Sequence, residues 1–210
     1  MRIERRFTKD GQSPYAEIEF RLTTSEIRNP DGSVVFRLDN VEVPEFWSQV
    51  ASDVLAQKYF RKAGVPSRLK KVEENSVPSF LWRSVADEAA LAQLPEAERM
   101  VGETSSKQVF DRLAGTWTYW GWKGGYFDSE NDAQMFFDEI RAMLALQMCA
   151  PNSPQWFNTG LHWAYGDRWS LARPFLCRLP DRRVDQVRIR LRASAAACLL
   201  HPVDLRRPSE

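Results

Sequence analysis

The residues most able to do metal or thiol chemistry are few and widely spaced. The imidazoles are His162 and His201, and the thiols are Cys149, Cys177 and Cys198. They show neither C-x-x-C nor H-x₃-H spacing, whereas zinc sites need clustered ligands of these types. An odd, sparse set of three cysteines also argues against the disulfide framework of a small secreted domain. We therefore expect no metal site, and we interpret Cys149, which follows an apolar segment, as a buried and inert thiol.

Two stretches rich in glycine and aromatic residues suggest ligand binding at first sight. Gly121–Tyr126 contains a lysine among three glycines and two aromatic residues, which could hold a phosphate. It lacks the G-x-x-x-x-G-K-S/T spacing of a phosphate-binding loop, so a tight helix–helix connection is favoured. Gly115–Trp120 could stack nucleic-acid bases. Its aromatic residues recur at helical spacing within an apolar stripe, which favours a place in the core.

The densest group of polar residues near a predicted helix end is Pro151–Gly160. Its small hydroxyls, amides and terminal glycine can present side-chain and backbone donors to an anionic ligand. On composition alone, a structural turn and an anion-binding loop explain this segment equally well.

Near the N-terminus the pattern predicts a pair of antiparallel strands. Tyr15–Leu22 alternates polar and apolar residues, which places Ile18 and Leu22, with Phe20 between them, on one half-buried face. Asn29–Gly32 has the composition of a turn, and Ser33–Leu38 follows as the second strand. Two strands alone are marginally stable, so the pair must pack against other elements.

The next 110 residues predict mainly helices. Apolar residues at three- and four-residue steps predict helices over residues 47–60, 105–120 and 129–149. Ser105 and Gln108 have the spacing of a capping box, which marks the start of the second helix. The segment 68–99 is charged and interrupted by prolines, so we expect it to be irregular apart from a short helix near 87–94.

The overall composition conceals a change near residue 167. The chain carries 29 Lys+Arg and 28 Asp+Glu, but residues 167–210 contain ten Arg, no Lys and only five acidic residues. The first 166 residues carry a net charge of −4 and hold 23 of the 25 aromatic residues. A basic, aromatic-poor tail is typical of a segment that binds nucleic acid or an acidic partner.

Three long strings of residues carry a resemblance to a known family. Ala51–Pro66, Ser106–Trp117 and Ala150–Gly166 resemble the adenosylcobalamin-dependent (class II) ribonucleotide reductases of bacteria. The likeness runs continuously from about Met1 to Gly166. These enzymes reduce ribonucleotides to 2′-deoxyribonucleotides, and the cofactor generates a thiyl radical that starts the reaction.

The resemblance implies a fold and a set of partners. The family's ten-stranded α/β barrel would begin near the end of the matching part, so this chain would be the truncated N-terminal region and barrel entry. Ser153 corresponds to the substrate-binding serine of the family, and Asn152 and Asn158 would shape its loop. The expected partners are a ribonucleotide substrate, an external dithiol reductant such as thioredoxin, and a second copy in a homodimer. By family the enzyme would be a ribonucleoside-diphosphate reductase. The radical and reducing cysteines of the family lie further downstream.

Beyond Gly166 the sequence stops matching the family, so Cys177 and Cys198 inherit no role from it. We interpret residues 167–210 as the product of a frameshift, because Val184–Val203 can be back-translated so that another frame spells the family's H-A-C-F motif. The alternative is a non-catalytic nucleic-acid-binding module that uses this basic tail. The coding DNA distinguishes the two interpretations.

The sequence thus predicts a mostly α-helical chain with a small N-terminal antiparallel β pair. We expect a hairpin region at residues 1–40, a helical region at 41–166 and a non-matching, disordered tail at 167–210. No apolar run approaches the roughly 20 residues of a membrane span, and the N-terminus lacks the core of a signal peptide. We expect a soluble, cytoplasmic protein.

Overall fold

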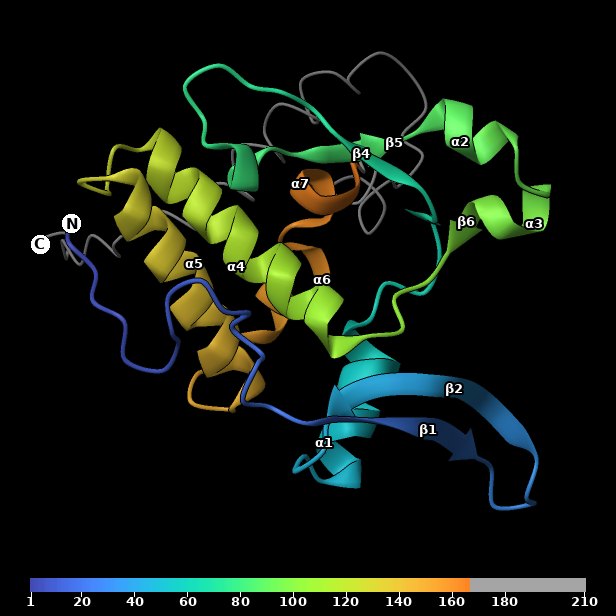
Figure 1. Cartoon of the computed structure of the whole chain (residues 1–210). Coiled ribbons are helices and arrows are strands. Elements are labelled where there is room, and N and C mark those ends of the chain that lie inside the picture. The colour runs from blue at the N-terminus through green and yellow to red at the C-terminus, as the bar shows by residue number, and fades with distance from the viewer. Residues whose placement is uncertain (167–210) are drawn as a thin grey trace, which may run out of the picture. The chain divides into compact units, whose positions relative to one another are not determined.

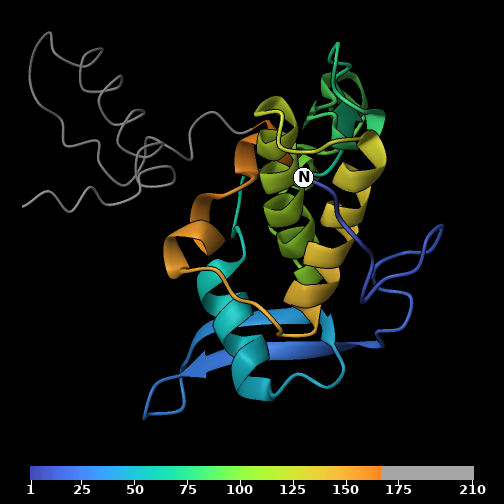
Figure 2. The same cartoon turned by 90° about the vertical axis from the view of Figure 1, so that its left-hand side faces the viewer.

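Two neighbouring helices, α4 (Ser106–Lys123) and α5 (Glu130–Ala145), form the centre of the fold in the computed structural model, which describes residues 1–166 (Figures 1 and 2). A β-hairpin lies at one end of this pair in both views. The hairpin strands are β1 (Phe20–Arg28) and β2 (Val34–Pro44). Short elements complete the fold: α1 (Gln49–Val54), η1 (Leu55–Tyr59), β3 (Val65–Pro66), β4 (Leu69–Lys71), η2 (Ser79–Leu81), β5 (Ser84–Ala86), α2 (Glu88–Ala92), α3 (Glu96–Arg99), β6 (Met100–Val101), α6 (Ser153–Asn158) and α7 (Leu161–Tyr165).

The starts of both long helices are as predicted. The Ser105 hydroxyl accepts from the Lys107 amide at 3.2 Å, and the Gln108 side chain accepts from the Ser105 amide at 3.0 Å, which completes the capping box of α4. The Ser129 hydroxyl accepts from the Asp132 amide at 3.1 Å at the start of α5. Helix α5 ends at Ala145, before the predicted position near residue 149. Gln147, two residues later, has a φ of 57°, which lies outside the right-handed helical region.

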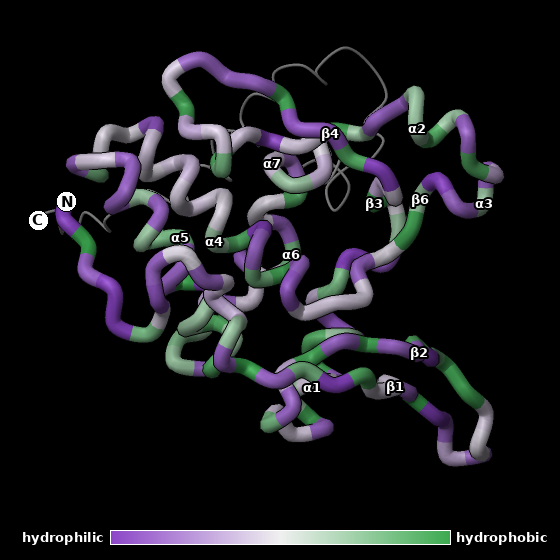
Figure 3. Tube along the Cα trace, viewed as in Figure 1, coloured by the Kyte–Doolittle hydropathy of each residue, from purple (hydrophilic) through white to green (hydrophobic). Residues whose placement is uncertain are grey.

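The predicted hairpin is present, with its turn in the expected place. Strands β1 and β2 pair in antiparallel register, and the Gly32 amide donates to the Asn29 carbonyl at 2.9 Å. Gly32 has a φ of 85°, which glycine adopts without strain. Both strands are displaced toward higher residue numbers than predicted, and hydrophobic and hydrophilic residues alternate along parts of them (Figure 3).

The buried face predicted for the first strand is wrong in part. Leu22 is 66% exposed, while Val41 and Val43 on β2 are fully buried. Leu22 lies opposite Glu42 in the register, so both side chains lie on the same face of the hairpin, where Glu42 pairs with Lys107. Val41 and Val43 lie on the other face. The alternation was therefore visible in the sequence, but the side that meets the helices is set by β2.

The fold is mixed α/β: the predicted N-terminal β pair and long helices are present, and two further small sheets that the sequence did not predict add to them. Besides the hairpin, β3 pairs with β6 and β4 pairs with β5, each as a two-stranded antiparallel sheet. Both sheets involve the segment 68–99 or its flanks, which was expected to be irregular. Strands of two or three residues are too short to show a period-two pattern. The short helix predicted near 87–94 is confirmed by α2.

The helix predicted over residues 47–60 is one continuous helical segment made of two elements. Helix α1 leads directly into η1, a π-helix, in which the Phe60 amide donates to the Leu55 carbonyl at 3.0 Å. The apolar residues at three- and four-residue steps in this segment include Val50, which is 72% exposed, whereas Leu55 and Phe60 are buried.

The main core lies between the base of the hairpin, η1 and the central helix pair. The Trp47 indole donates to the Ala145 carbonyl at 2.8 Å and so links the end of β2 to the end of α5. The other buried members of this cluster are Val41, Val43, Leu55, Ala56, Phe60, Val109, Phe110, Leu113, Leu144, Ala145 and Trp156. Trp156 belongs to the polar segment singled out above, so that segment is anchored to the core.

Several predictions lie outside the described residues. The frameshifted or nucleic-acid-binding tail, its predicted disorder, and the roles withheld from Cys177 and Cys198 all concern residues 167–210. The division at residue 40 stays a prediction, although β2 continues to Pro44. No helix within residues 1–166 is both long enough and apolar enough to cross a membrane.

Candidate functional site

The polar segment Pro151–Gly160 forms a short helix, α6, where the sequence left a turn and a ligand-binding loop open. The Asn152 side chain accepts from the Ser153 amide at 2.9 Å at its start, and Pro154 lies in its first turn, where proline is tolerated. Asn152, Ser153 and Asn158 are all exposed. Asn152 and Ser153 are brought together, whereas Asn158 lies at the other end of α6, roughly 7 Å along the helix axis.

Tyr59, the last residue of the π-helix, contacts this segment directly. Its hydroxyl lies 3.2 Å from the Ser153 hydroxyl, and either atom can be the donor. Its ring stacks on Trp156 with a centroid separation of 5.5 Å and meets Phe157 edge-on at 5.2 Å. The Trp156 indole donates to the Pro151 carbonyl at 2.9 Å, which closes the segment on itself.

A fully buried arginine ties this segment to helix α4. Arg112 donates to the carbonyl oxygens of Tyr59, Trp156 and Thr159 at 3.1, 2.8 and 2.7 Å. Its Nε donates to Glu103 Oε1 at 2.8 Å, and both side chains are 0% exposed. A buried charge is tolerated only when it is paired and hydrogen-bonded, and Arg112 is both.

Glu103 accepts two further hydrogen bonds besides those from Arg112. It accepts from the Arg61 amide at 2.7 Å and from the Tyr165 hydroxyl at 2.8 Å. Burial, and then the charge of Glu103, raise the pKa of the Tyr165 phenol, so this hydroxyl stays a donor. Between them, Arg112 and Glu103 join η1, α6 and α7 to α4.

Gly160 permits the close approach of the α6–α7 turn to the backbone of α4. Its φ is 89°, and a Cβ atom there would lie 2.2 Å from the Arg112 carbonyl oxygen. A side chain at this position would therefore clash with the backbone of α4 as well as strain the turn between α6 and α7.

Sequence reasoning missed the Arg112–Glu103 pair. A signal was present, because Arg112 lies between the apolar residues Phe110 and Leu113 on the buried side of a confirmed helix. A cation in such a position needs a buried partner. The sequence did not indicate which of the 28 acidic residues would supply it.

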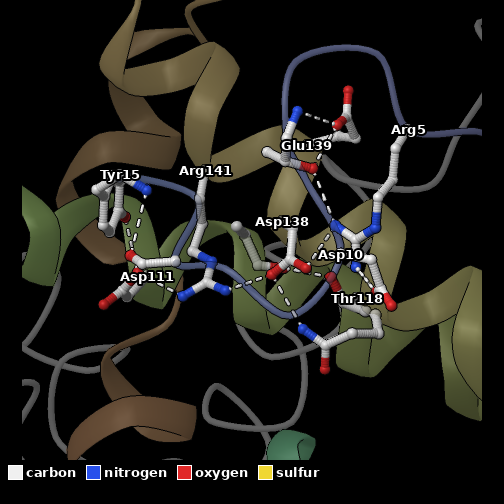
Figure 4. A network of polar contacts seen from close by, with 12 residues as sticks. Arg5, Asp10, Tyr15, Asp111, Thr118, Asp138, Glu139 and Arg141 are labelled. Atoms are coloured by element: carbon white, nitrogen blue, oxygen red, sulfur yellow. Dashed lines mark hydrogen bonds and ion pairs between the residues drawn. The ribbon is translucent and has the colours of Figure 1, made fainter. Parts of the chain in front are cut away.

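A second polar network fastens the N-terminal segment to the helix pair (Figure 4). Arg5 pairs with Asp138 at 2.8 Å, and Arg141 lies between Asp138 at 2.6 Å and Asp111 at 3.4 Å. The Tyr15 hydroxyl donates to Asp111 at 2.8 Å. Burial raises the pKa of Asp111, which Arg141 and Tyr15 partly offset. Arg5, Arg141 and Tyr15 each contact an aspartate of the network, which holds the N-terminal segment against the helix pair.

The other stretches considered for ligand binding have structural roles. Gly121–Tyr126 ends α4 and leads to α5, as the favoured interpretation predicted, and its lysine, Lys123, pairs with Glu74 at 2.9 Å. In the aromatic stretch, Gly115 is buried against Trp163, and Trp117 is half-buried, but Trp120 is 45% exposed. Cys149 is half-buried, and burial raises the pKa of its thiol.

A pocket within the described residues is too small for adenosylcobalamin. No group of three or more His, Cys, Asp or Glu side chains within residues 1–166 could hold a metal ion. His162, the imidazole of this part of the chain, has its Nε2 3.2 Å from the Arg83 guanidinium. A pocket beside the N-terminal segment, between Phe7 and Leu146, has a volume of about 150 Å³. Pockets for drug-sized ligands span roughly 300–1,000 Å³, and a corrinoid is larger than such ligands.

Comparison with known proteins identifies the relatives of this chain. Residues 21–147 match the family model described as class II vitamin B12-dependent ribonucleotide reductase. Proteins named vitamin B12-dependent ribonucleotide reductase are similar over 166 residues, with 81% identity in Bradyrhizobium diazoefficiens, 76% in Agrobacterium fabrum and 30% in Rhodopirellula baltica. Each match covers 79% of this chain and 13% of the relative. With most of its described residues matched by the family model, the chain belongs to the class II vitamin B12-dependent ribonucleotide reductase family, as part of its N-terminal region.

Proposed function

We propose that residues 1–166 serve as the N-terminal region of an enzyme that reduces ribonucleotides to 2′-deoxyribonucleotides for DNA synthesis. The match to the family model over residues 21–147 supports this proposal. The chain spans about 13% of the length of the relatives it matches, so the activity would belong to the longer protein. In that protein, the region would lead into a ten-stranded α/β barrel.

In this proposal Ser153 binds the phosphate end of the ribonucleotide. The observation that carries it is an exposed hydroxyl on a segment whose backbone is anchored by the buried Arg112. A hydroxyl held in this way donates to an anionic oxygen without first losing the freedom of a flexible loop. Asn152, beside Ser153, and Asn158, at the far end of α6, would shape the edges of the site.

The chemical step requires parts beyond residues 1–166. Bound adenosylcobalamin would supply the radical that starts the reaction. By resemblance to the family, the radical cysteine and the reducing cysteines would lie in the downstream part of the enzyme. An external dithiol such as thioredoxin would regenerate the reducing cysteines. We therefore expect no turnover from the 210-residue chain when it is mixed with a ribonucleoside diphosphate, adenosylcobalamin and dithiol. Deoxynucleotide formation in that mixture would contradict this proposal.

A chimeric enzyme tests the role of Ser153. Residues 1–166 of this chain would replace the matching region of the Bradyrhizobium diazoefficiens relative, which is 81% identical. We expect adenosylcobalamin-dependent formation of deoxynucleotide, and we expect Ser153→Ala to raise KM roughly 10-fold or more because a hydrogen bond to a charged group contributes about 1.5–3 kcal/mol.

Ser79→Ala is the matched control for this chimera. Ser79 is the exposed first residue of η2, as Ser153 is the exposed first residue of α6. Its replacement should leave KM unchanged. An unchanged KM in Ser153→Ala would remove Ser153 from the substrate site.

A further inference from the structure

We propose that Tyr59 is a positioning residue for the substrate hydroxyl: its phenol holds the Ser153 side chain in the orientation that donates to a ribonucleotide phosphate. This inference rests on the function proposed above for Ser153. It adds a residue from a different segment, 94 positions away in the chain, and gives a role to the π-helix that carries it.

The π-helix sets where Tyr59 lies. Its hydrogen bond from the Phe60 amide to the Leu55 carbonyl spans five residues, and the chain leaves the helix immediately afterwards, with Phe60 in an extended conformation. Such wide turns are rare and occur frequently at functional sites. Here the wide turn delivers the last residue of the helix to the edge of α6.

Tyr59 is held in this position from two sides. Its carbonyl oxygen accepts from Arg112 Nη2 at 3.1 Å, which fixes the backbone. Its ring lies against Trp156 and Phe157, which fixes the side chain. The phenolic oxygen therefore has little freedom, and it lies 3.2 Å from the Ser153 Oγ.

The direction of this hydrogen bond decides what Ser153 can do. A serine hydroxyl has one proton and two lone pairs, and its proton rotates to suit its partners. When the Tyr59 phenol donates to Ser153 Oγ, the serine proton is left for another acceptor. An anionic phosphate oxygen is such an acceptor, and hydrogen bonds in series strengthen one another. The pair then acts as a relay of two donors that ends on the ligand.

A purely structural role for Tyr59 makes a different prediction. Its ring and its backbone carbonyl would suffice to pack and anchor the segment, and Tyr59→Phe retains both. Only the orientation of the Ser153 hydroxyl depends on the phenolic oxygen. Removing this oxygen should therefore affect ligand binding only when Ser153 is present.

Titration of the full 210-residue chain with cytidine diphosphate, and in parallel with cytidine triphosphate, tests the inference. Two-dimensional ¹⁵N–¹H NMR detects weak binding, and the Trp156 indole, stacked on Tyr59, reports on the site. We expect Tyr59→Phe to weaken binding about 2- to 10-fold, the range for one lost hydrogen bond. In the Ser153→Ala background, the same change should have no further effect. Tyr126→Phe, at a ring that is 59% exposed, is the control and should bind like the unaltered chain.

The outcomes separate this inference from the function on which it rests. If the unaltered chain does not bind, or if Ser153→Ala binds as tightly as the unaltered chain, the proposed role of Ser153 fails and the inference fails with it. If Ser153→Ala weakens binding and Tyr59→Phe does not, Ser153 keeps its role and the inference is overturned. Equal weakening by Tyr59→Phe in both backgrounds would also overturn it, because the effect would not pass through Ser153.

Discussion

Replacing Glu103 by glutamine should be among the most destabilising conservative changes in this chain. Glutamine keeps the shape of the side chain but removes its charge, which leaves the fully buried Arg112 guanidinium without a counter-ion. Breaking a buried pair in this way costs about 3–5 kcal/mol. Each glutamate oxygen also accepts two hydrogen bonds, including those from Tyr165 and from the Arg61 amide. An amide nitrogen in place of either oxygen would face donors only.

The expected loss is large compared with the whole stability of a domain, which is about 5–15 kcal/mol. Urea denaturation followed by tryptophan fluorescence measures it. With a slope of roughly 2 kcal/mol per molar, a loss of about 4 kcal/mol lowers the midpoint by about 2 M. Lys123→Met is the control, because it breaks the partly exposed pair with Glu74, and such pairs contribute about 0–1 kcal/mol. A Glu103→Gln variant within 1 kcal/mol of the unaltered chain would refute the reasoning.

The double variant Arg112→Met/Glu103→Leu tests which part of the arrangement matters. In several proteins a buried ion pair is replaced by apolar residues without loss. Here Arg112 also serves the carbonyl groups of Tyr59, Trp156 and Thr159, and an unsatisfied buried polar group costs about 1–3 kcal/mol. We therefore expect the double variant to remain less stable than the unaltered chain. Full recovery would show that the three carbonyls do not depend on Arg112.

Three smaller predictions concern packing, protonation and a helix cap. Gly115→Ala should lower the free energy of unfolding by about 1–3 kcal/mol, because its Cβ would lie 2.2 Å from the Trp163 ring, and adding Trp163→Phe should recover part of the loss in a urea titration. Burial, and then Asp111, raise the pKa of the Tyr15 phenol well above its usual value of 10. The stability that this neutral group contributes is therefore complete below about pH 10 and falls as the pH rises further, so Tyr15→Phe should flatten the fall of Tm above pH 10. Ser129→Ala should cost about 0.5–2 kcal/mol through the lost cap of α5, which thermal unfolding measures.

The elements that the sequence predicted well are those specified by neighbouring residues. The starts of α4 and α5 depend on Ser105 with Gln108 and on Ser129, all within one turn of the helix they begin. The turn at Asn29–Gly32 is equally local. Such signals require no knowledge of the rest of the chain, since the donor and its acceptor are a few residues apart.

The elements that were missed depend on distant residues. Val65–Pro66 is a strand only because Met100–Val101 lies beside it, and Leu69–Lys71 only because Ser84–Ala86 does. Val50 fits an apolar stripe in sequence but is exposed. Which face of a short helix is buried depends on the elements packed against it, and for α1 those include η1 and strand β1 of the hairpin.

The candidate site combines both kinds of information. Ser153 was singled out by its polar neighbours and by the family resemblance, but its contacts were not predictable. Tyr59 lies 94 residues from Ser153, and Arg112 reaches carbonyl groups 44 and 47 residues further along the chain. No local pattern encodes such separations, so the three-dimensional structure was needed to find them.

These long-range contacts all begin and end within the described part of the chain. Tyr59 and Arg112 hold α6 from one side, and Glu103 fixes Arg112 while binding Tyr165 of α7. Within the described residues, the segment that carries Ser153 is therefore held by contacts from η1 and α4. It follows that a ribonucleotide can be tested on the 210-residue chain. Glu103→Gln should then weaken ribonucleotide binding more than Lys123→Met does, although neither residue contacts Ser153.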